Sequence, residues 1–417
     1  MGGSIPGIHP GEVDSPPKQS AAMSAPKIVI ASAVRTPIGR FNGTLAGMSA
    51  PELGAAAGNA ALKAASLSAE DVDRVIMGYA RQAGAGPNPA RQMQSLMGIP
   101  EASTAWTLNQ ACASGLKTLQ MAADELKLGR AKVVLAGGME SMSRVPFMLD
   151  RMRTGYRLGD APVIDGMYRD GFQCPIANMI MGETAELLAQ ERGISREEQD
   201  QFALDSQRKA GEARDAGRFQ DEMIPLTIKS RKGETVLDFD EHMRPDATLE
   251  SMAKLPAVFA KENGTVTPGN ASGITDGAAA LVLMTADEAE RRGISPLAEL
   301  MDVEVTGTDP KRMGLGPVPA TNQLFERNGW QMSDFGLFEL NEAFAAQVLA
   351  CLQELPIPRE LLNVNGGAIA LGHPIGCTGA RITVTLLHEM RRRKVDRGLA
   401  TLCVSGGLGI SAGFQLV

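Results

Sequence analysis

One arrangement of segments occurs twice along the chain, and this repeat constrains the fold more than any other feature. In the first copy, an Asn-Gln-Ala-Cys turn at 109–112 precedes a helix from about Ser114 to Leu128, a basic turn, a strand over Lys132–Ala136 and a Gly-Gly pair. In the second copy, an Asn-Gly-Gly-Ala turn at 365–368 precedes a helix over Ala380–Arg393, a basic turn, a strand over Leu399–Val404 and another Gly-Gly pair. The repeat predicts a duplicated core whose two loop sets meet at a pseudo-twofold axis, where open α/β sheets tend to bind ligands.

Other apolar runs extend this pattern over most of the chain. They predict strands over Lys27–Val34, Asp73–Gly78, Thr104–Asn109, Gly277–Met284 and Gly336–Leu340. A helix is expected at about Ala50–Ala65, with its small apolar residues on one face. Strands that alternate with helices indicate an α/β sheet with helices packed on its faces.

Between Ser143 and about Asn270 the charges become dense and strand signals become sparse. Helices are expected over Gly182–Arg192 and Arg196–Ala216, the second announced by Ser195 with Glu198 three residues later, a capping box. This stretch predicts an inserted, mainly helical subdomain. Residues 1–26 are rich in Pro, Gly and Ser and are expected to be disordered.

The composition excludes several classes of protein. With 44% hydrophobic and 21% charged residues, the chain is an ordinary globular one, and no apolar run reaches the roughly 18 residues of a membrane span. A net charge of −7 gives no general attraction to nucleic acids or anionic membranes. The five cysteines include no CxxC pair, so neither a disulfide framework nor a structural zinc site is expected. With no secretory or transit signal at the start, a reduced, cytoplasmic setting is expected.

Two cysteines and one histidine stand at positions suited to chemistry. Cys112 lies between a strand and a helix, where the helix N-terminus favours a thiolate nucleophile, although a small buried packing residue fits the position equally. His373, in a Gly-His-Pro turn, suits a base that activates a thiol, or a surface loop residue. Cys403 ends the last buried strand and, by itself, is expected to be a core cysteine.

Two further features leave alternatives open. Asn341, just after a strand, suits a group that orients a water molecule or donates to a carbonyl oxygen, or a cap for the next helix. The glycine loops at 366–367 and 406–409 suit phosphate binding. Neither loop completes a GxGxxG after a strand, which argues against a nucleotide-dependent oxidoreductase.

Taken together, these segments resemble the thiolase family from about Ile28 to Val417. The matching stretches are Val34–Gly39 (VRTPIG), Asn109–Gly115 (NQACASG), Asn341–Ala345 (NEAFA), Asn365–Gly376 (NGGAIALGHPIG) and Cys403–Gly409 (CVSGGLG). The resemblance implies an α/β fold of five layers, α-β-α-β-α, built from two βαβαβαββ halves. It implies an N-terminal half at 27–142 and 275–296, a helical loop domain that binds coenzyme A at 143–274, and a C-terminal half at 297–417.

The resemblance also implies roles for individual residues. Cys112 matches the acylated nucleophile, His373 its activating base, and Cys403 the acid/base for the α-carbon of the second acyl group. Asn341 matches the residue that holds a water which, with His373, binds a thioester oxygen. The backbone N–H groups of Cys112 and Ser405 match a second oxyanion site. Ser405 departs from the usual Cys-x-Gly-Gly-Gly run, and it keeps the donor unless the loop needs a positive φ there.

Substrate contacts follow from the same resemblance. Arg244, Ser251, Phe259 and Ser272 match positions that line the coenzyme A groove, and Met181, Met313 and Phe344 match the acyl pocket. Ile180 stands where acetoacetyl-forming members commonly carry His, and Cys377 is expected to fill space. No metal and no tightly bound cofactor are expected, since coenzyme A and acetyl-CoA are substrates. No nucleic acid or membrane partner is expected, and the implied assembly is a homodimer or homotetramer.

The activity implied is acyl transfer between acyl-CoA molecules: reversible Claisen condensation of two acetyl-CoA to acetoacetyl-CoA and coenzyme A, through an acyl-cysteine. One alternative is a degradative 3-ketoacyl-CoA thiolase of medium-chain preference. Another is a non-catalytic scaffold or lipid carrier, which predicts the loss of at least one of the four catalytic residues, and all four are present. A ketoacyl synthase would carry two histidines with one cysteine, and the second cysteine argues against it.

Overall fold

The computed structural model describes residues 25–230 and 233–417. Residues 1–24 of the extension expected to be disordered lie outside the described residues. No helix in the described part of the chain combines the length and apolarity needed to cross a membrane.

The strands of the two chain halves follow the same order. The first half runs β4 (Thr104–Leu108), β3 (Arg74–Gly78), β5 (Val133–Ser141), β12 (Thr275–Thr285) and β1 (Ile28–Arg35), and the second runs β14 (Leu337–Leu340), β15 (Arg397–Val404), β16 (Leu408–Leu416) and β13 (Ala298–Gly307). In each half the first pairings are parallel and the last two antiparallel. A parallel bridge between Phe338 and Leu362 occupies the place that β4 has in the first half. The duplication expected from the repeat is therefore present.

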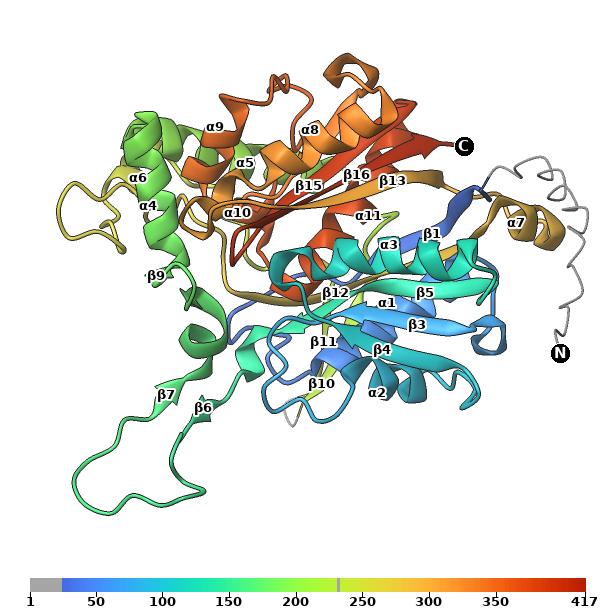
Figure 1. The fold of residues 1–417 in the computed structure, drawn as a ribbon, viewed down its shortest axis with the longest axis horizontal. Coiled ribbons are helices and arrows are strands. Elements are labelled where there is room, and N and C mark those ends of the chain that lie inside the picture. Colours follow the sequence, from blue (N-terminus) through green and yellow to red (C-terminus); the bar gives the residue numbers. More distant parts are fainter. Residues whose placement is uncertain (1–24, 231–232) are drawn as a thin grey trace, which may run out of the picture.

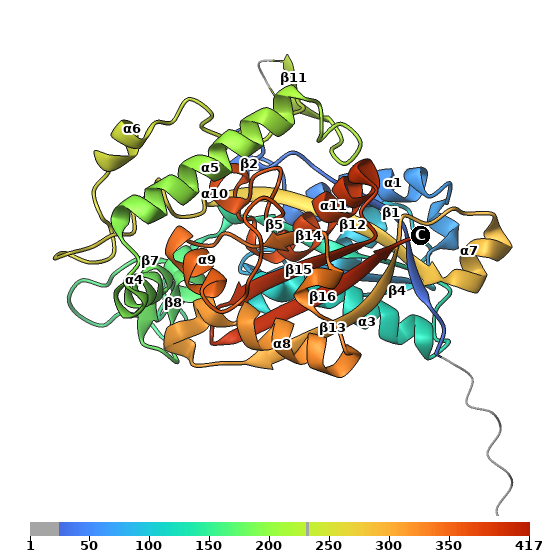
Figure 2. The ribbon, with the colours of Figure 1, turned by 90° about the horizontal axis from the view of Figure 1, so that it is seen from above.

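The halves enclose a shared helical layer (Figures 1 and 2). Helices α3 (Ser114–Lys127) and α11 (Ile375–Arg393) pack against each other and against both sets of strands. Outside them lie α1 (Ala50–Ala64) and α2 (Pro89–Leu96) on the first half and α8 (Pro317–Asn328) on the second. Within residues 25–230 and 233–417, the two strand sets pair with each other only at β1 and β13, through Val29–Glu299 and Ile30–Ala298. This is the expected five-layer arrangement.

Apolar periodicity explains the central layer. On α3 the residues Leu116, Leu119, Ala123 and Leu126 recur at helical spacing, and all are buried in the core that α3 shares with α11 and the strands. Outside it, α1 begins with a capping box in which Ser49 and Glu52 satisfy each other's backbone N–H groups. The remaining core elements are β2 (Gly39–Arg40), α7 (Ala286–Arg292), α9 (Ala345–Leu352) and α10 (Ala368–Leu371).

Two elements run further than the sequence predicts. Strand β5 continues through Gly137 and Gly138 to Ser141, because these glycines lie inside the strand rather than in a turn after it. A Cβ atom at Gly138 would come within 2.2 Å of the carbonyl oxygen of Gly376, so glycine lets α11 approach the strand closely. Helix α11 correspondingly starts at Ile375 instead of Ala380.

The segment between β5 and β12 carries the predicted helices and additional short strands. The helices are α4 (Met181–Arg192), α5 (Arg196–Asp215) and α6 (Leu249–Ala253), and Ser195 caps α5 as expected. The strands form the pairs β6 (Phe147–Met148) with β7 (Ile164–Asp165), β8 (Gln173–Cys174) with β9 (Met179–Ile180), and β10 (Leu226–Ser230) with β11 (Gly233–Leu237). Figure 1 shows the first pair at the base of a long projecting arm.

Candidate active site

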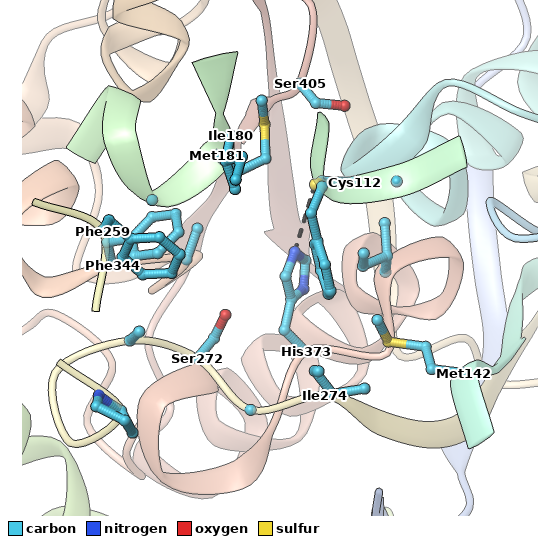
Figure 3. Close-up of a pocket in the computed structure, with 18 of the residues that line it drawn as sticks. Cys112, Met142, Ile180, Met181, Phe259, Ser272, Ile274, Phe344, His373 and Ser405 are labelled. Carbon is cyan, nitrogen blue, oxygen red and sulfur yellow. Dashed lines mark hydrogen bonds between the residues drawn. The ribbon is translucent and has the colours of Figure 1, made fainter. Parts of the chain in front are cut away.

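A cavity of about 360 Å³ collects side chains from distant parts of the chain (Figure 3). Its wall combines Cys112, His373, Cys403 and Ser405 from the core with Met181, Phe259 and Ser272 from the segment between β5 and β12. Cys112 follows β4, His373 precedes α11, and Cys403 and Ser405 lie at the end of β15. The duplicated topology brings these three loops together.

A strained turn presents Cys112. The residue lies in a 3-10 turn (η2, Ala111–Ala113) before α3, and Ala111 has a φ of +46°, which non-glycine residues rarely adopt. Side chains of the motif hold this turn: the Ala111 N–H donates to Asn109 Oδ1 at 3.0 Å, and the Gln110 N–H donates to Ser114 Oγ at 2.9 Å. The motif therefore fixes the position of the thiol.

His373 faces Cys112 through one ring nitrogen and Thr378 through the other. Its Nε2 lies 3.3 Å from Cys112 Sγ, a contact that Figure 3 marks with a dashed line. Its Nδ1 lies 2.7 Å from Thr378 Oγ1. The Thr378 hydroxyl donates its only proton to the carbonyl oxygen of Pro374 at 3.0 Å, so it accepts from His373. This network assigns the proton to Nδ1 and leaves an unprotonated Nε2 facing the thiol, the arrangement of a base.

Burial keeps this pair neutral at rest. The pKa of His373 is lowered to about 3, mainly by burial and further by the cations Arg381 and Arg81. Burial also raises the pKa of the Cys112 thiol, although Arg81 and the backbone N–H of Ser405 oppose this shift. The expectation that the helix N-terminus alone would favour a resting thiolate is therefore wrong, because desolvation outweighs it.

The second cysteine and its loop lie beside the first. Cys403 ends β15, is buried, and has a thiol whose pKa burial raises well above its usual range. In the following loop Gly406 and Gly407 take the positive φ values, +89° and +83°, whereas Ser405 does not. A serine therefore fits at 405 without strain, and its N–H points at Cys112 Sγ.

Asn341 follows β14 and is buried, and it does not line the cavity. Within the described residues neither its side-chain oxygen nor its side-chain nitrogen has a hydrogen-bond partner. Helix α9 begins at Ala345, after Phe344, without any side-chain cap. The helix-capping interpretation of Asn341 is wrong, and its amide is free to bind a water or a ligand group.

The predicted substrate-contacting residues divide into two groups. Those that line the cavity are Phe259, Ser272, Met181, Met313 and Phe344, together with Ile180. The Phe259 and Phe344 rings meet edge to face at 6.3 Å, and Met181 and Met313 pack in one apolar cluster with Cys403.

Arg244 and Ser251 do not line the cavity. The exposed Arg244 guanidinium folds back to donate to the carbonyl oxygens of Glu241, His242 and Met243. The exposed Ser251 hydroxyl donates to the carbonyl oxygen of Thr248 at the start of α6. Cys377 is buried in the central layer, away from the cavity wall.

Several residues of the site lie outside every sequence motif. Thr378 lies in the first turn of α11, five residues after His373 and just beyond the matched motif. Arg81, Phe172 and His242 also line the cavity, and no motif announces them. Burial and the neighbouring Arg244 lower the pKa of His242 to about 4, so this ring is neutral.

The comparisons with known proteins agree with this architecture. The model of the thiolase N-terminal domain matches residues 28–287, and the model of the thiolase C-terminal domain matches residues 294–415. An acetyl-CoA acetyltransferase of Rhizobium meliloti is 51% identical over 93% of this chain and 98% of its own length.

Solved structures give the same result. The acetyl-CoA acetyltransferase of Bacillus anthracis superposes with a TM-score of 0.92 at 44% identity, covering 94% of this chain and 99% of its own. Human mitochondrial 3-ketoacyl-CoA thiolase in complex with CoA superposes with a TM-score of 0.91 at 41% identity, covering 94% and 98%.

Proposed function

The chain belongs to the thiolase family, and from this premise we propose that it is an acetyl-CoA acetyltransferase. It joins two acetyl-CoA into acetoacetyl-CoA and free coenzyme A, and it cleaves acetoacetyl-CoA in reverse. The observation that carries this proposal is the 3.3 Å contact between an unprotonated His373 Nε2 and Cys112 Sγ in a mostly apolar cavity. Relatives of about half-identical sequence over nearly their whole length bear the same activity in their names, which favours it over a medium-chain degradative thiolase.

The first step is transfer of an acyl group to Cys112. As Sγ attacks the thioester carbonyl, its proton passes to His373 Nε2, and the coenzyme A thiolate leaves with a proton from the same ring. Because burial keeps both groups neutral at rest, the charged pair forms only together with the new bond. The backbone N–H groups of Cys112 and Ser405 both lower the pKa of the Cys112 thiol, which supports our assignment of these two donors to the oxyanion of the acyl group held there.

The second step needs a base at the α-carbon of the incoming acetyl-CoA. Cys403 first gives its own proton to His373 and, as a thiolate, takes the α-proton. The resulting carbanion attacks the acyl group on Cys112, and the Cys112 thiolate that leaves recovers the proton held by His373. A thiol whose pKa burial raises is a strong base once ionised and an efficient acid in the reverse direction. The thioester oxygen of the second substrate carries the enolate charge, and His373 with a water held by the free amide of Asn341 stabilises it.

Coenzyme A enters this site as a substrate and leaves as a product. We assign its binding to the segment 143–274, because Phe259 and Ser272 from that segment form the cavity wall opposite the core residues. Arg244 and Ser251 lie outside the cavity and remain candidates for contacts with the nucleotide end. The segments 27–142 with 275–296, and 297–417, then act as the two core halves.

The surface supports assembly of a homodimer or homotetramer. Strand β6 and the arm that follows it expose large apolar side chains, including Phe147 at 67% and Leu158 at 99%, and exposed apolar surface of this kind marks interfaces. Strand β4 lies at the end of the strand order, and no strand of the described residues pairs with its outer edge. All five cysteines are free thiols, which suits a reducing cytoplasm.

A thiolysis series tests the proposed activity. The kcat/KM for coenzyme A-dependent cleavage is measured with uncharged 3-oxoacyl-CoA substrates of four, six and ten carbons. The side chains of Met181, Met313 and Phe344 line the pocket, and a methyl-ended chain that overpacks them costs about 1–3 kcal/mol, so among uncharged substrates the four-carbon one is expected to be best and the six-carbon one weaker. A profile that rises toward ten carbons would assign the chain to the degradative class.

A further inference from the structure

Arg81 places a buried cation on the wall of the catalytic cavity. It follows β3, is only 5% exposed, and lines the cavity together with Cys112. Its guanidinium carbon lies 6.0 Å from the centre of the Phe172 ring. Gly171 packs so closely that a Cβ atom there would come within 2.3 Å of Arg81 Nε. The backbone at 171–172 thus leaves room for the guanidinium, and any larger residue at 171 would displace it.

Among the described residues, this guanidinium contacts the Phe172 ring but has no hydrogen-bonding partner. Within the described residues its N–H groups donate no hydrogen bond and form no ion pair, and the buried Nε is unpaired. Arg35, which is also buried, shows the usual arrangement: it donates to both Glu222 and Asp240. A buried arginine is almost always paired, because its desolvation is otherwise uncompensated.

Glu140 is the acidic neighbour of Arg81, and its carboxylate does not fully neutralise the guanidinium charge. Its carboxylate oxygens accept from the N–H groups of Ala80 at 3.1 Å, Arg81 at 3.1 Å and Gly376 at 2.7 Å. Burial raises the pKa of Glu140 to about 7, so its negative charge is partial at neutral pH. The wall beside Cys112 therefore keeps unused donors and a net positive charge.

The missing anion must come from a ligand that enters the cavity. A volume of about 360 Å³ admits an acyl group, and the wall that carries Arg81 also carries Cys112, the residue on which we propose the acyl group is held. We propose that Arg81 binds the free carboxylate of an acyl chain, so that the enzyme also cleaves and forms 3-oxoacyl-CoA thioesters that end in a carboxylate. The proposal rests on the thiolase activity proposed above. Bidentate pairing with a carboxylate uses the planar donor set that only arginine offers.

The reaction is the same thiolysis with a different acyl group. Cys112 Sγ attacks the keto carbonyl at C3 and gives its proton to His373, and the bond between C2 and C3 breaks. C2 keeps the electron pair and takes a proton from Cys403, which releases acetyl-CoA. The carboxylate-ended acyl group stays on Cys112 until the coenzyme A thiol attacks it and releases the Cys112 thiolate. Two protons, one held by His373 and one from the coenzyme A thiol, then return Cys403 and Cys112 to neutral thiols.

The test compares charged and uncharged substrates of equal length. We would measure kcat/KM for thiolysis of 3-oxoacyl-CoA thioesters of six and eight carbons, each with either a terminal carboxylate or a terminal methyl group. The expected wild-type preference for the carboxylate is about tenfold or more at one of these lengths, the effect of one charge-assisted hydrogen-bonded pair. R81M is expected to lower this ratio by about 10- to 100-fold, and R81K by less, because lysine keeps the charge. R169M is the matched control, because Arg169 lies in the turn that packs against Arg81 through Gly171 and Phe172 but is itself exposed and paired with Asp150.

The outcomes separate the two proposals. If wild type does not cleave acetoacetyl-CoA, the proposed function fails. If it does, but shows no preference for the carboxylate at either length, or R81M leaves the preference unchanged, the assignment of Arg81 is wrong. If R81M raises the KM for coenzyme A and keeps the preference for the carboxylate, Arg81 binds a phosphate instead. If R81M lowers Tm and keeps that preference, Arg81 is a structural partner of Glu140. Both results overturn the inference.

Discussion

The hydroxyl of Thr378 decides which nitrogen of His373 faces Cys112, so removing it tests the base assignment directly. Thr378→Val keeps the shape of the side chain but removes the acceptor that lies 2.7 Å from Nδ1. The carbonyl oxygen of Pro374 loses one donor and still accepts from the backbone N–H groups of Cys377 at 2.8 Å and Thr378 at 2.9 Å. The whole effect therefore falls on the Nδ1–H of His373.

The size of the effect follows from the burial of this ring. A buried donor left without a partner costs about 1–3 kcal/mol, and the ring can avoid that cost by moving its proton to Nε2. In that tautomer no lone pair faces the thiol. The fraction of enzyme with a competent base, and with it kcat, is expected to fall by roughly 5- to 150-fold.

The assay is kcat for thiolysis of acetoacetyl-CoA, with the rate of Cys112 alkylation by iodoacetamide as a second readout. Thr378→Ser is the matched control, since it keeps the hydroxyl and is expected to stay near wild type in both. If Thr378→Val is within about twofold of wild type in kcat and in alkylation rate, the proton is not held on Nδ1 by this contact, and the assignment of His373 as the base loses its support.

Further predictions concern the other polar groups of the site. The pKa of His373 is lowered from 6.5 to about 3, so the unfolded chain binds a proton that the folded chain does not, and stability falls as pH drops below about 6.5. Between pH 7 and about 4.5, protonation linked to this ring lowers the free energy of unfolding by about 2–3 kcal/mol. In urea titrations, the free energy of unfolding of His373→Gln should therefore fall by that much less than that of wild type over the same pH range. An equal fall in both proteins would contradict the neutral buried ring. Cys403→Ser should still acquire an acyl group from acetyl-CoA but condense about 100-fold slower or worse, as rapid-quench kinetics would show; near-normal condensation would remove Cys403 from the mechanism. Asn341→Leu replaces an unpaired buried amide with an apolar group, so Tm should hold or rise while kcat falls about tenfold or more; a lower Tm with unchanged kcat would make the amide structural.

Features that follow from local periodicity could be predicted from the sequence. The apolar spacing of α3, the capping box of α5 and the repeat of helix, basic turn and strand all reflect the short-range chemistry of a helix or strand. The two-residue strand pairs β6–β7 and β8–β9 could not be predicted, because so short a strand carries no period. The sequence predicts a strand that ends before Gly137-Gly138, whereas β5 includes both glycines, since only the position of α11 shows why glycine is needed inside the strand.

The candidate site also has features that the sequence predicts and features that it does not. The motifs identify Cys112, His373, Cys403 and Ser405, and the fold brings these residues to one cavity. Their roles stay predictions. Burial decides what the motifs leave open: it sets the pKa directions of Cys112 and His373. Arg81 could not be found from the sequence, because an unpaired cation is recognised only once its neighbours are known.

The central claim is that Cys112 carries the acyl group, and the most direct measurement is to find it. The protein is mixed with acetoacetyl-CoA in the absence of free coenzyme A, quenched in acid, and digested for peptide mass spectrometry. The account predicts one acetyl group on the peptide that contains Cys112, none on those with Cys174, Cys351, Cys377 or Cys403, and loss of the label when coenzyme A is added before the quench. An acetyl group on another cysteine that coenzyme A removes at the rate of turnover, or turnover by Cys112→Ser at the wild-type rate, would contradict it.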